Sequence, residues 1–107
     1  MPRNYKVFIQ DILSAVKSIE TYTRGLSFNE FRANRLIIDA TVRNLEIIGE
    51  AAKNIPSDIR DKYNQIEWKK IAGLRDILIH EYFGVDIDLL WDIIKTKLPE
   101  LKKLLKK

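Results

Sequence analysis

Four side chains with versatile chemistry, Arg75, Asp76, His80 and Tyr82, lie within eight residues at the end of an apolar segment. His80 is the only histidine of the chain, and an imidazole can accept and donate a proton near neutral pH. Arg75 carries a permanent charge on a planar group that matches the geometry of a phosphate. This combination suits acid–base chemistry at a phosphate ester. The alternative is structural, with His80 hydrogen-bonded to Asp76 and Arg75 paired with a surface acid.

The spacing of these residues limits how they can cooperate. On an ideal helix Arg75 and Tyr82 project within about 20° of each other, and Asp76 and His80 are close enough to hydrogen-bond. Arg75 and His80 diverge by about 140°. They can therefore act on one phosphate only if the helix is deformed near Glu81 or if the second group comes from another copy of the chain.

The composition excludes most other kinds of catalytic site. The chain has no cysteine, which removes disulfides, thiolate nucleophiles and cysteine-based zinc sites. It also lacks a glycine-rich phosphate loop, a paired-histidine metal site and a Gly-x-Ser-x-Gly elbow. With one histidine, a dedicated transition-metal site is not expected. We therefore expect neither a metal nor another cofactor.

Length and charge indicate a small globular protein. At 107 residues the chain is expected to form a single domain, residues 1–107. The net charge of +4 is concentrated after residue 94, where six lysines face one acid, Glu100. Apolar runs are too short to span a bilayer and no signal peptide is recognisable, so we expect a cytoplasmic protein without membrane association.

Helical spacing of apolar residues, without alternating strand patterns, predicts an all-α bundle of four main helices and a short connector. Ser27 and Glu30 form a capping box at the start of the second helix, and Pro99 should kink or restart the fourth. The expected elements run from Asn4 to Gly25, from Ser27 to about Lys53, from a cap at Ser57 or Asp58 to about Tyr63, from about Trp68 to Tyr82, and from Asp86 onward.

The second predicted helix carries apolar residues on two nearly opposite faces. One face covers the core of the domain. We expect a second copy of the chain to cover the other face, which predicts a homodimer; the alternative cover is short flanking helices of the same chain. The two stripes contain Phe31, Ile38, Leu45 and Ala52, and Ala33, Ile37, Ala40, Ile47 and Ala51.

Two stretches, RNLEIIGEAAKNIP (43–56) and WKKIAGLRDILIHEYFGVD (68–86), resemble the HepT-like proteins of the HEPN superfamily. The similarity covers essentially the whole chain. The family signature Arg-x4-His-x-Tyr matches at Arg75, His80 and Tyr82, and Asp76 stands where the superfamily usually has Asn, Asp or His. The resemblance implies a dimeric HEPN-type helical bundle that cleaves RNA without a metal.

The resemblance further implies the toxin of a toxin–antitoxin pair. The antitoxin would be a minimal nucleotidyltransferase that silences the toxin by transferring adenylate to Tyr82. In the reaction we infer, the RNA 2′-OH attacks the adjacent phosphate, with Arg75 and His80 catalytic and Asp76 and Tyr82 supporting them. Two alternatives stay open: a non-catalytic partner or substrate-binding subunit of a nucleotidyltransferase, and a purely structural dimerisation domain.

Overall fold

The computed structural model describes residues 4–80 and 86–106, except for the side chains of residues 75–80. Every regular element in these ranges is helical, which confirms the predicted all-α class. The elements are α1 (Tyr5–Thr23), α2 (Phe28–Arg32), α3 (Arg35–Lys53), α4 (Ser57–Lys62), α5 (Trp68–His80), α6 (Ile87–Asp92), the π-helical turn η2 (Ile93–Lys97) and α7 (Leu98–Leu105).

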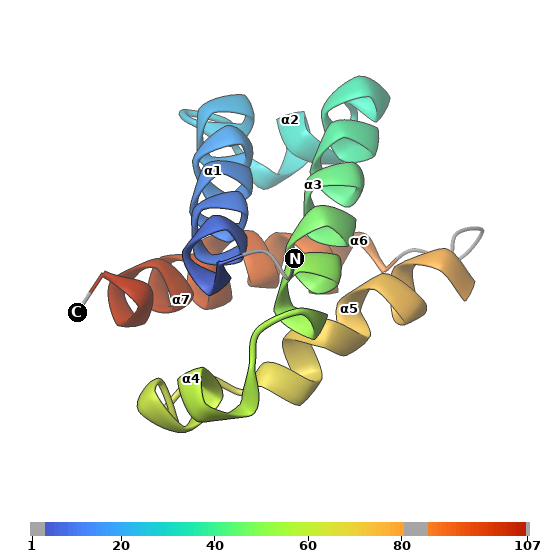
Figure 1. Cartoon of the computed structure of the whole chain (residues 1–107). Coiled ribbons are helices and arrows are strands. Elements are labelled where there is room, and N and C mark those ends of the chain that lie inside the picture. The colour runs from blue at the N-terminus through green and yellow to red at the C-terminus, as the bar shows by residue number, and fades with distance from the viewer. Residues whose placement is uncertain (1–3, 81–85, 107) are drawn as a thin grey trace.

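The two long helices α1 and α3 lie side by side and run in opposite directions (Figure 1). The short helix α2 lies at the end where α1 stops and α3 starts. The arm formed by α6, η2 and α7 crosses this pair, and α5 packs against α3 after the connector α4. Helix α5, which carries most of the candidate residues, therefore lies outside the α1–α3 pair and contacts it through α3.

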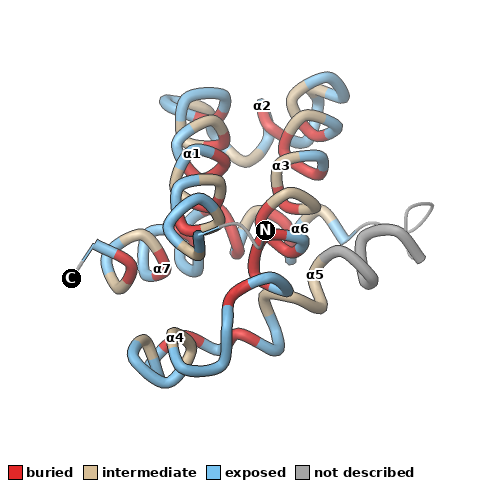
Figure 2. Tube along the Cα trace, viewed as in Figure 1, coloured by how far each residue is buried: buried red, intermediate tan, exposed pale blue. Residues whose placement is uncertain are grey.

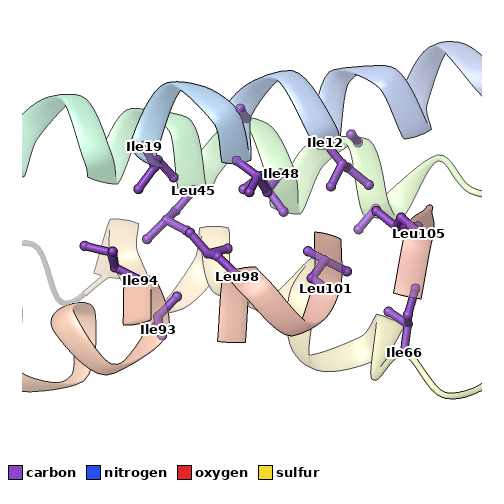
Figure 3. Close-up of a cluster of buried hydrophobic side chains, with 14 of the residues drawn as sticks. Ile12, Ile19, Leu45, Ile48, Ile66, Ile93, Ile94, Leu98, Leu101 and Leu105 are labelled. Carbon is purple, nitrogen blue, oxygen red and sulfur yellow. The ribbon is translucent and has the colours of Figure 1, made fainter. Parts of the chain in front are cut away.

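The core lies between the α1–α3 pair and the crossing arm (Figure 3). Figure 2 shows that the buried sides of these helices face one another. Helical spacing after Asp86 predicts one apolar face, and five of its seven members are buried. The predicted face consists of Ile87, Leu90, Trp91, Ile94, Leu98, Leu101 and Leu105. Core side chains come from α1 (Ile12, Ile19), α3 (Leu45, Ile48), the arm (Leu90, Ile93, Ile94, Leu98, Leu101, Leu105) and the segment before α5 (Ile66).

The predicted boundaries of the first helix are confirmed. The Asn4 side chain caps α1, because its Oδ1 accepts a hydrogen bond from the backbone N of Lys6 at 3.0 Å. The helix ends at Thr23, and Gly25 follows with a φ of 77°, a conformation that glycine adopts without steric cost.

The prediction of one continuous helix from Ser27 to Lys53 is wrong. The capping box is present, but α2 ends at Arg32 and a new helix begins at Arg35. Asn34 is the N-cap of α3, and its Oδ1 accepts a hydrogen bond from the backbone N of Ile37 at 3.1 Å. The side chain thus supplies an acceptor for a backbone N–H in the first turn of α3, which has no acceptor within the helix. The break lets Phe31 turn inward, where it is fully buried.

The connector helix begins where expected but is capped differently. Ser57 and Asp58 lie within the first turn of α4, and the N-cap is Pro56, which makes no side-chain cap bond. Arg60 supplies polar contacts instead: its Nε donates to the Ile55 carbonyl and its Nη2 to the Ala52 carbonyl, each at 3.0 Å. The guanidinium therefore satisfies carbonyls at and just beyond the end of α3.

The helix around Pro99 does not restart as predicted but continues through a π-helical turn. The π-helical turn η2 precedes α7, which has this proline in its first turn. The backbone N–H of Leu98 donates to the carbonyl of Ile93, five residues earlier, rather than to that of Ile94. Because proline has no amide and crowds the preceding turn, π-helical bonding replaces α-helical bonding just before it, while the backbone stays right-handed helical at Asp92, Lys97 and Leu98.

The second apolar stripe of α3 is partly covered within a single chain. Ala51 is buried and Ile37, Ala40 and Ile47 are half-buried, because α1 and α5 pack on α3. Ala33, before the break, is exposed. The stripe therefore gives less support to a dimer than the sequence pattern does. No helix in the described ranges has both the length and the apolar composition needed to cross a bilayer.

Candidate functional site

The first turn of α5 is anchored to the segment before it. Trp68 is buried, and its indole Nε1 donates to the carbonyl of Tyr63 at 3.2 Å, while its backbone N donates to the carbonyl of Ile66 at 2.9 Å. Ile71 and Leu74 are half-buried against the core. The part of α5 that precedes the candidate residues is thus held by both packing and hydrogen bonds.

Glu67 lies just before α5 and carries a charge that suits a helix N-terminus. Its Oε2 lies 2.9 Å from Nζ of Lys70. The hydrogen bond and the charge of Lys70 lower the pKa of Glu67, and Lys97 on η2 adds a smaller effect in the same direction. Since both members of the pair are exposed, the pair contributes little to stability. The contacts of Glu67 show that two cationic groups, Lys70 and Lys97, lie near the start of α5.

The predicted catalytic residues lie on the second half of α5. Arg75, Asp76 and His80 are in regular α-helix as far as the backbone is described, and Tyr82 lies outside the described residues. No helix deformation separates Arg75 from His80, so a five-residue spacing places them on faces about 140° apart. The regular backbone of α5 therefore does not bring Arg75 and His80 of one chain to the same side of the helix, where they could bind one substrate together.

A groove of about 600 Å³ runs beside the first half of α5, between this helix and the arm of α6, η2 and α7. Its lining is mainly aliphatic, and Leu89 on its wall is half exposed. Lys69 and Lys97 stand at its edges, on α5 and η2, together with Glu67 and Glu100. The aliphatic lining is Ile48, Ile66, Ile71, Leu74, Leu89, Leu90, Ile93, Leu98, Leu101 and Leu104.

The sequence prediction missed this groove. The expected apolar face of the last helix contained neither Leu89 nor Ile93, yet both line the groove. A signal was present in the adjacent apolar pairs at 89–90 and 93–94, which make the apolar side of this helix wider than a single core requires. The π-helical turn also shifts the register after residue 93, which no periodicity based on an α-helix includes.

Gly73 lies on the groove side of α5, and a Cβ built on it meets no atom within 4 Å. We therefore expect Gly73→Ala to raise the free energy of unfolding by about 1 kcal/mol, since alanine loses less backbone entropy in a helix interior. Urea denaturation measures the change. Ala72→Gly is the matched reverse substitution and should lower it by a similar amount. A loss of stability in Gly73→Ala would contradict this account of the helix.

Among the described residues, no group of three or more His, Asp or Glu side chains is arranged to hold a metal ion. The polar groups near α5 are instead lysines and single carboxylates, which are ordinary contacts for a charged polymer or a protein surface.

An all-helical bundle with an Arg-x4-His-x-Tyr motif that begins within α5 defines a class of small helical domains. The chain belongs to the family described as "Ribonuclease HepT-like", whose model matches residues 12–107. Two relatives match over nearly their full lengths. "Putative RNase MJ1380" of Methanocaldococcus jannaschii is 46% identical over 94% of this chain and 93% of its own. "Probable ribonuclease HepT" of Thermococcus cleftensis is 44% identical over 95% and 93%.

A longer relative shows the same similarity over part of its length. "Gamma-glutamylcyclotransferase and putative RNase MJ0434" of Methanocaldococcus jannaschii is 44% identical over 96% of this chain, which spans 46% of that protein. No solved structure matches the chain with significance. The family and these names support a nuclease activity.

Proposed function

We propose that this protein is a metal-independent endoribonuclease and the toxin of a toxin–antitoxin pair, acting as one domain in the cytoplasm. Membership of the ribonuclease family carries the proposal. The Arg75–Tyr82 motif supplies groups for proton transfer and phosphate binding, on a helix whose first half is fixed to the core. RNA is the substrate class that this chemistry fits best.

In the proposed reaction the nucleophile belongs to the substrate. The 2′ oxygen of one ribose attacks the adjacent phosphorus while the bond from phosphorus to the 5′ oxygen breaks. A base removes the 2′ proton and an acid protonates the leaving 5′ oxygen, which yields a 2′,3′-cyclic phosphate and a 5′-OH. His80 carries protons, and Arg75 binds the phosphate and stabilises its developing charge. Asp76 orients His80, and Tyr82 positions the substrate.

We propose a homodimer with the two motif helices near its two-fold axis. Each chain has one histidine, and one imidazole can act first as the base and then as the acid, so each phosphate requires one Arg75–His80 pair. A two-fold axis would also bring Arg75 of one chain toward His80 of its partner, although they lie on different faces of a single α5. The exposed apolar groove beside α5 supports this placement, because such a surface is one that a second chain would cover.

Purified protein incubated with total RNA in EDTA tests the proposed function. The proposal expects cleavage that persists in EDTA and leaves cyclic phosphate ends, and that is absent with His80→Ala. Cleavage only after a divalent ion is added would overturn metal independence. No cleavage, together with nucleotide transfer only in the presence of a nucleotidyltransferase, would instead identify a non-catalytic subunit. Thermal unfolding of both proteins controls for misfolding.

The proposed antitoxin is a minimal nucleotidyltransferase that adenylates Tyr82. The added phosphodiester and nucleoside would place negative charge and bulk beside Arg75. This negative charge would repel RNA phosphate, as an added phosphate group does in proteins regulated by phosphorylation. We expect Tyr82→Phe to keep most cleavage while resisting silencing, since only the hydroxyl accepts adenylate. Mass spectrometry after incubation with the partner and ATP checks this. Adenylate on Tyr5, Tyr22 or Tyr63 instead would remove Tyr82 from the regulation.

A further inference from the structure

A cluster of aromatic and basic side chains lies where α2 meets α6, outside the residues used so far. The rings of Phe28 and Trp91 are 5.9 Å apart between centroids, with an interplanar angle of 60°. Trp91 also lies 5.0 Å from Phe31, which is fully buried and holds the indole from below. Phe28 and Trp91 are only half-buried. One large aromatic surface is therefore fixed in place and partly open to solvent.

One cation contacts Trp91, and a second lies on the same helix as Phe28. The Nζ of Lys95 lies over the Trp91 ring, 4.6 Å from its centroid. Arg32 follows Phe28 by four residues on α2, so the two share one face of that helix. Both cations are exposed, and neither forms an ion pair with any residue that the structure describes. We refer to Phe28, Arg32, Trp91 and Lys95 as the Trp91 patch.

The acids closest in sequence keep their negative charge but bind groups other than the two cations. Glu30, two residues before Arg32, accepts a hydrogen bond from the backbone N of Ser27 at 2.9 Å. Asp92 is three residues before Lys95, but its Oδ1 accepts a hydrogen bond from Oγ1 of Thr96 at 3.2 Å. Asp88 is exposed on α6 and forms no ion pair with Lys95 in the described structure. The lysine ammonium rests on the indole ring instead of on either carboxylate. It is thus held by a weak contact that a stronger anionic ligand can replace.

The Trp91 patch lies within reach of the motif helix. Asp86 follows His80 by six positions, so their Cα atoms are at most about 20 Å apart. Trp91 follows Asp86 by five residues of mostly helical chain, or about 8 Å along the axis. A ligand bound at the motif and extended by several units can therefore reach the patch.

We propose that the Trp91 patch is a binding subsite for single-stranded RNA, in which a base stacks on Trp91 and two backbone phosphates bind Arg32 and Lys95. Aromatic rings with adjacent cations bind unpaired nucleotides in this way, through stacking and charge. Lys95 leaves the ring for a phosphate when the base stacks, because its stem is flexible and its head is exposed. The subsite rests on the proposed ribonuclease function for its substrate class.

The test measures binding separately from cleavage. A labelled twelve-nucleotide RNA is titrated with His80→Ala protein, which leaves the RNA intact, and anisotropy reports the Kd over a range of salt. Adding Arg32→Gln and Lys95→Gln should weaken binding about tenfold and reduce the salt slope by about 1.4, since each single-strand phosphate contact contributes about 0.7. Trp91→Phe, which keeps an aromatic ring on Phe31, should weaken binding about threefold.

The control pair is Lys103→Gln and Lys106→Gln, which removes the same charge from exposed positions on and just after α7. It should change Kd less than twofold. Equal losses in both pairs, or no loss with Arg32 and Lys95 replaced, would overturn the subsite. If wild-type protein binds RNA through the patch but never cleaves it, the ribonuclease proposal fails and the subsite stands. If wild type cleaves RNA and the double variant keeps its KM, the subsite fails alone.

Discussion

We expect His80→Ala and Arg75→Ala each to lower the kcat of RNA cleavage by a factor of about 10² to 10⁴, which is the range for loss of a general acid–base group or of a charged stabiliser of the transition state. The two losses have different causes. Without His80 no group at the motif carries protons near neutral pH. Without Arg75 the phosphate loses its charged donors while the proton carrier is intact.

Further substitutions separate these roles. Arg75→Lys keeps the charge but not the planar fork, and we expect it to recover only part of the activity. Asp76→Asn should cost less than either alanine substitution, because Asp76 acts through His80. Arg24→Ala removes an exposed arginine at the end of α1 and should leave kcat unchanged. Undiminished cleavage by folded His80→Ala protein would contradict the assignment of the catalytic motif.

The fold is largely predictable from the sequence because its determinants are local. The Asn4 cap and the Ser27–Glu30 capping box depend on neighbouring residues, and the structure contains both of them. The break before α3 has Asn34 as the N-cap of the new helix. Asparagine also occurs inside helices, as Asn44 does in α3, so its presence alone does not predict a break. The segment before the break packs Phe31 against Trp91, a tertiary contact that local helix propensity does not include.

The candidate site is less predictable than the fold. Residue types indicate what Arg75 and His80 can do, and the helical spacing correctly places them on different faces of α5. The groove beside α5 was not predicted, because residues 48, 66 and 98 that line it are brought together only by the crossing of helices distant in sequence. The Trp91 patch was missed for the same reason, since α2 and α6 are far apart in the chain.

Arg75 and His80 lie on different faces of α5, so in the proposed mechanism the two groups at one phosphate come from different chains. In the proposed dimer, Arg75 of one chain and His80 of its partner serve the same phosphate. An Arg75→Ala chain still has His80, and a His80→Ala chain still has Arg75, so each could complete a pair with a chain of the other variant. A dimer of Arg75→Ala chains has only histidines, and a dimer of His80→Ala chains has only arginines, so neither contains a complete pair.

Mixing the two inactive variants should therefore restore cleavage. After random exchange about half of the dimers are mixed, and each keeps one of its two Arg75–His80 pairs, so recovery reaches up to about a quarter of wild-type activity. Native mass spectrometry of size-tagged chains verifies that mixed dimers form. As a matched control, His80→Ala mixed with the double variant Arg75→Ala/His80→Ala contains no histidine at the motif and should stay inactive. Mixed dimers of the two single variants without recovered cleavage would show that one chain must supply both groups, which the regular helix between Arg75 and His80 opposes.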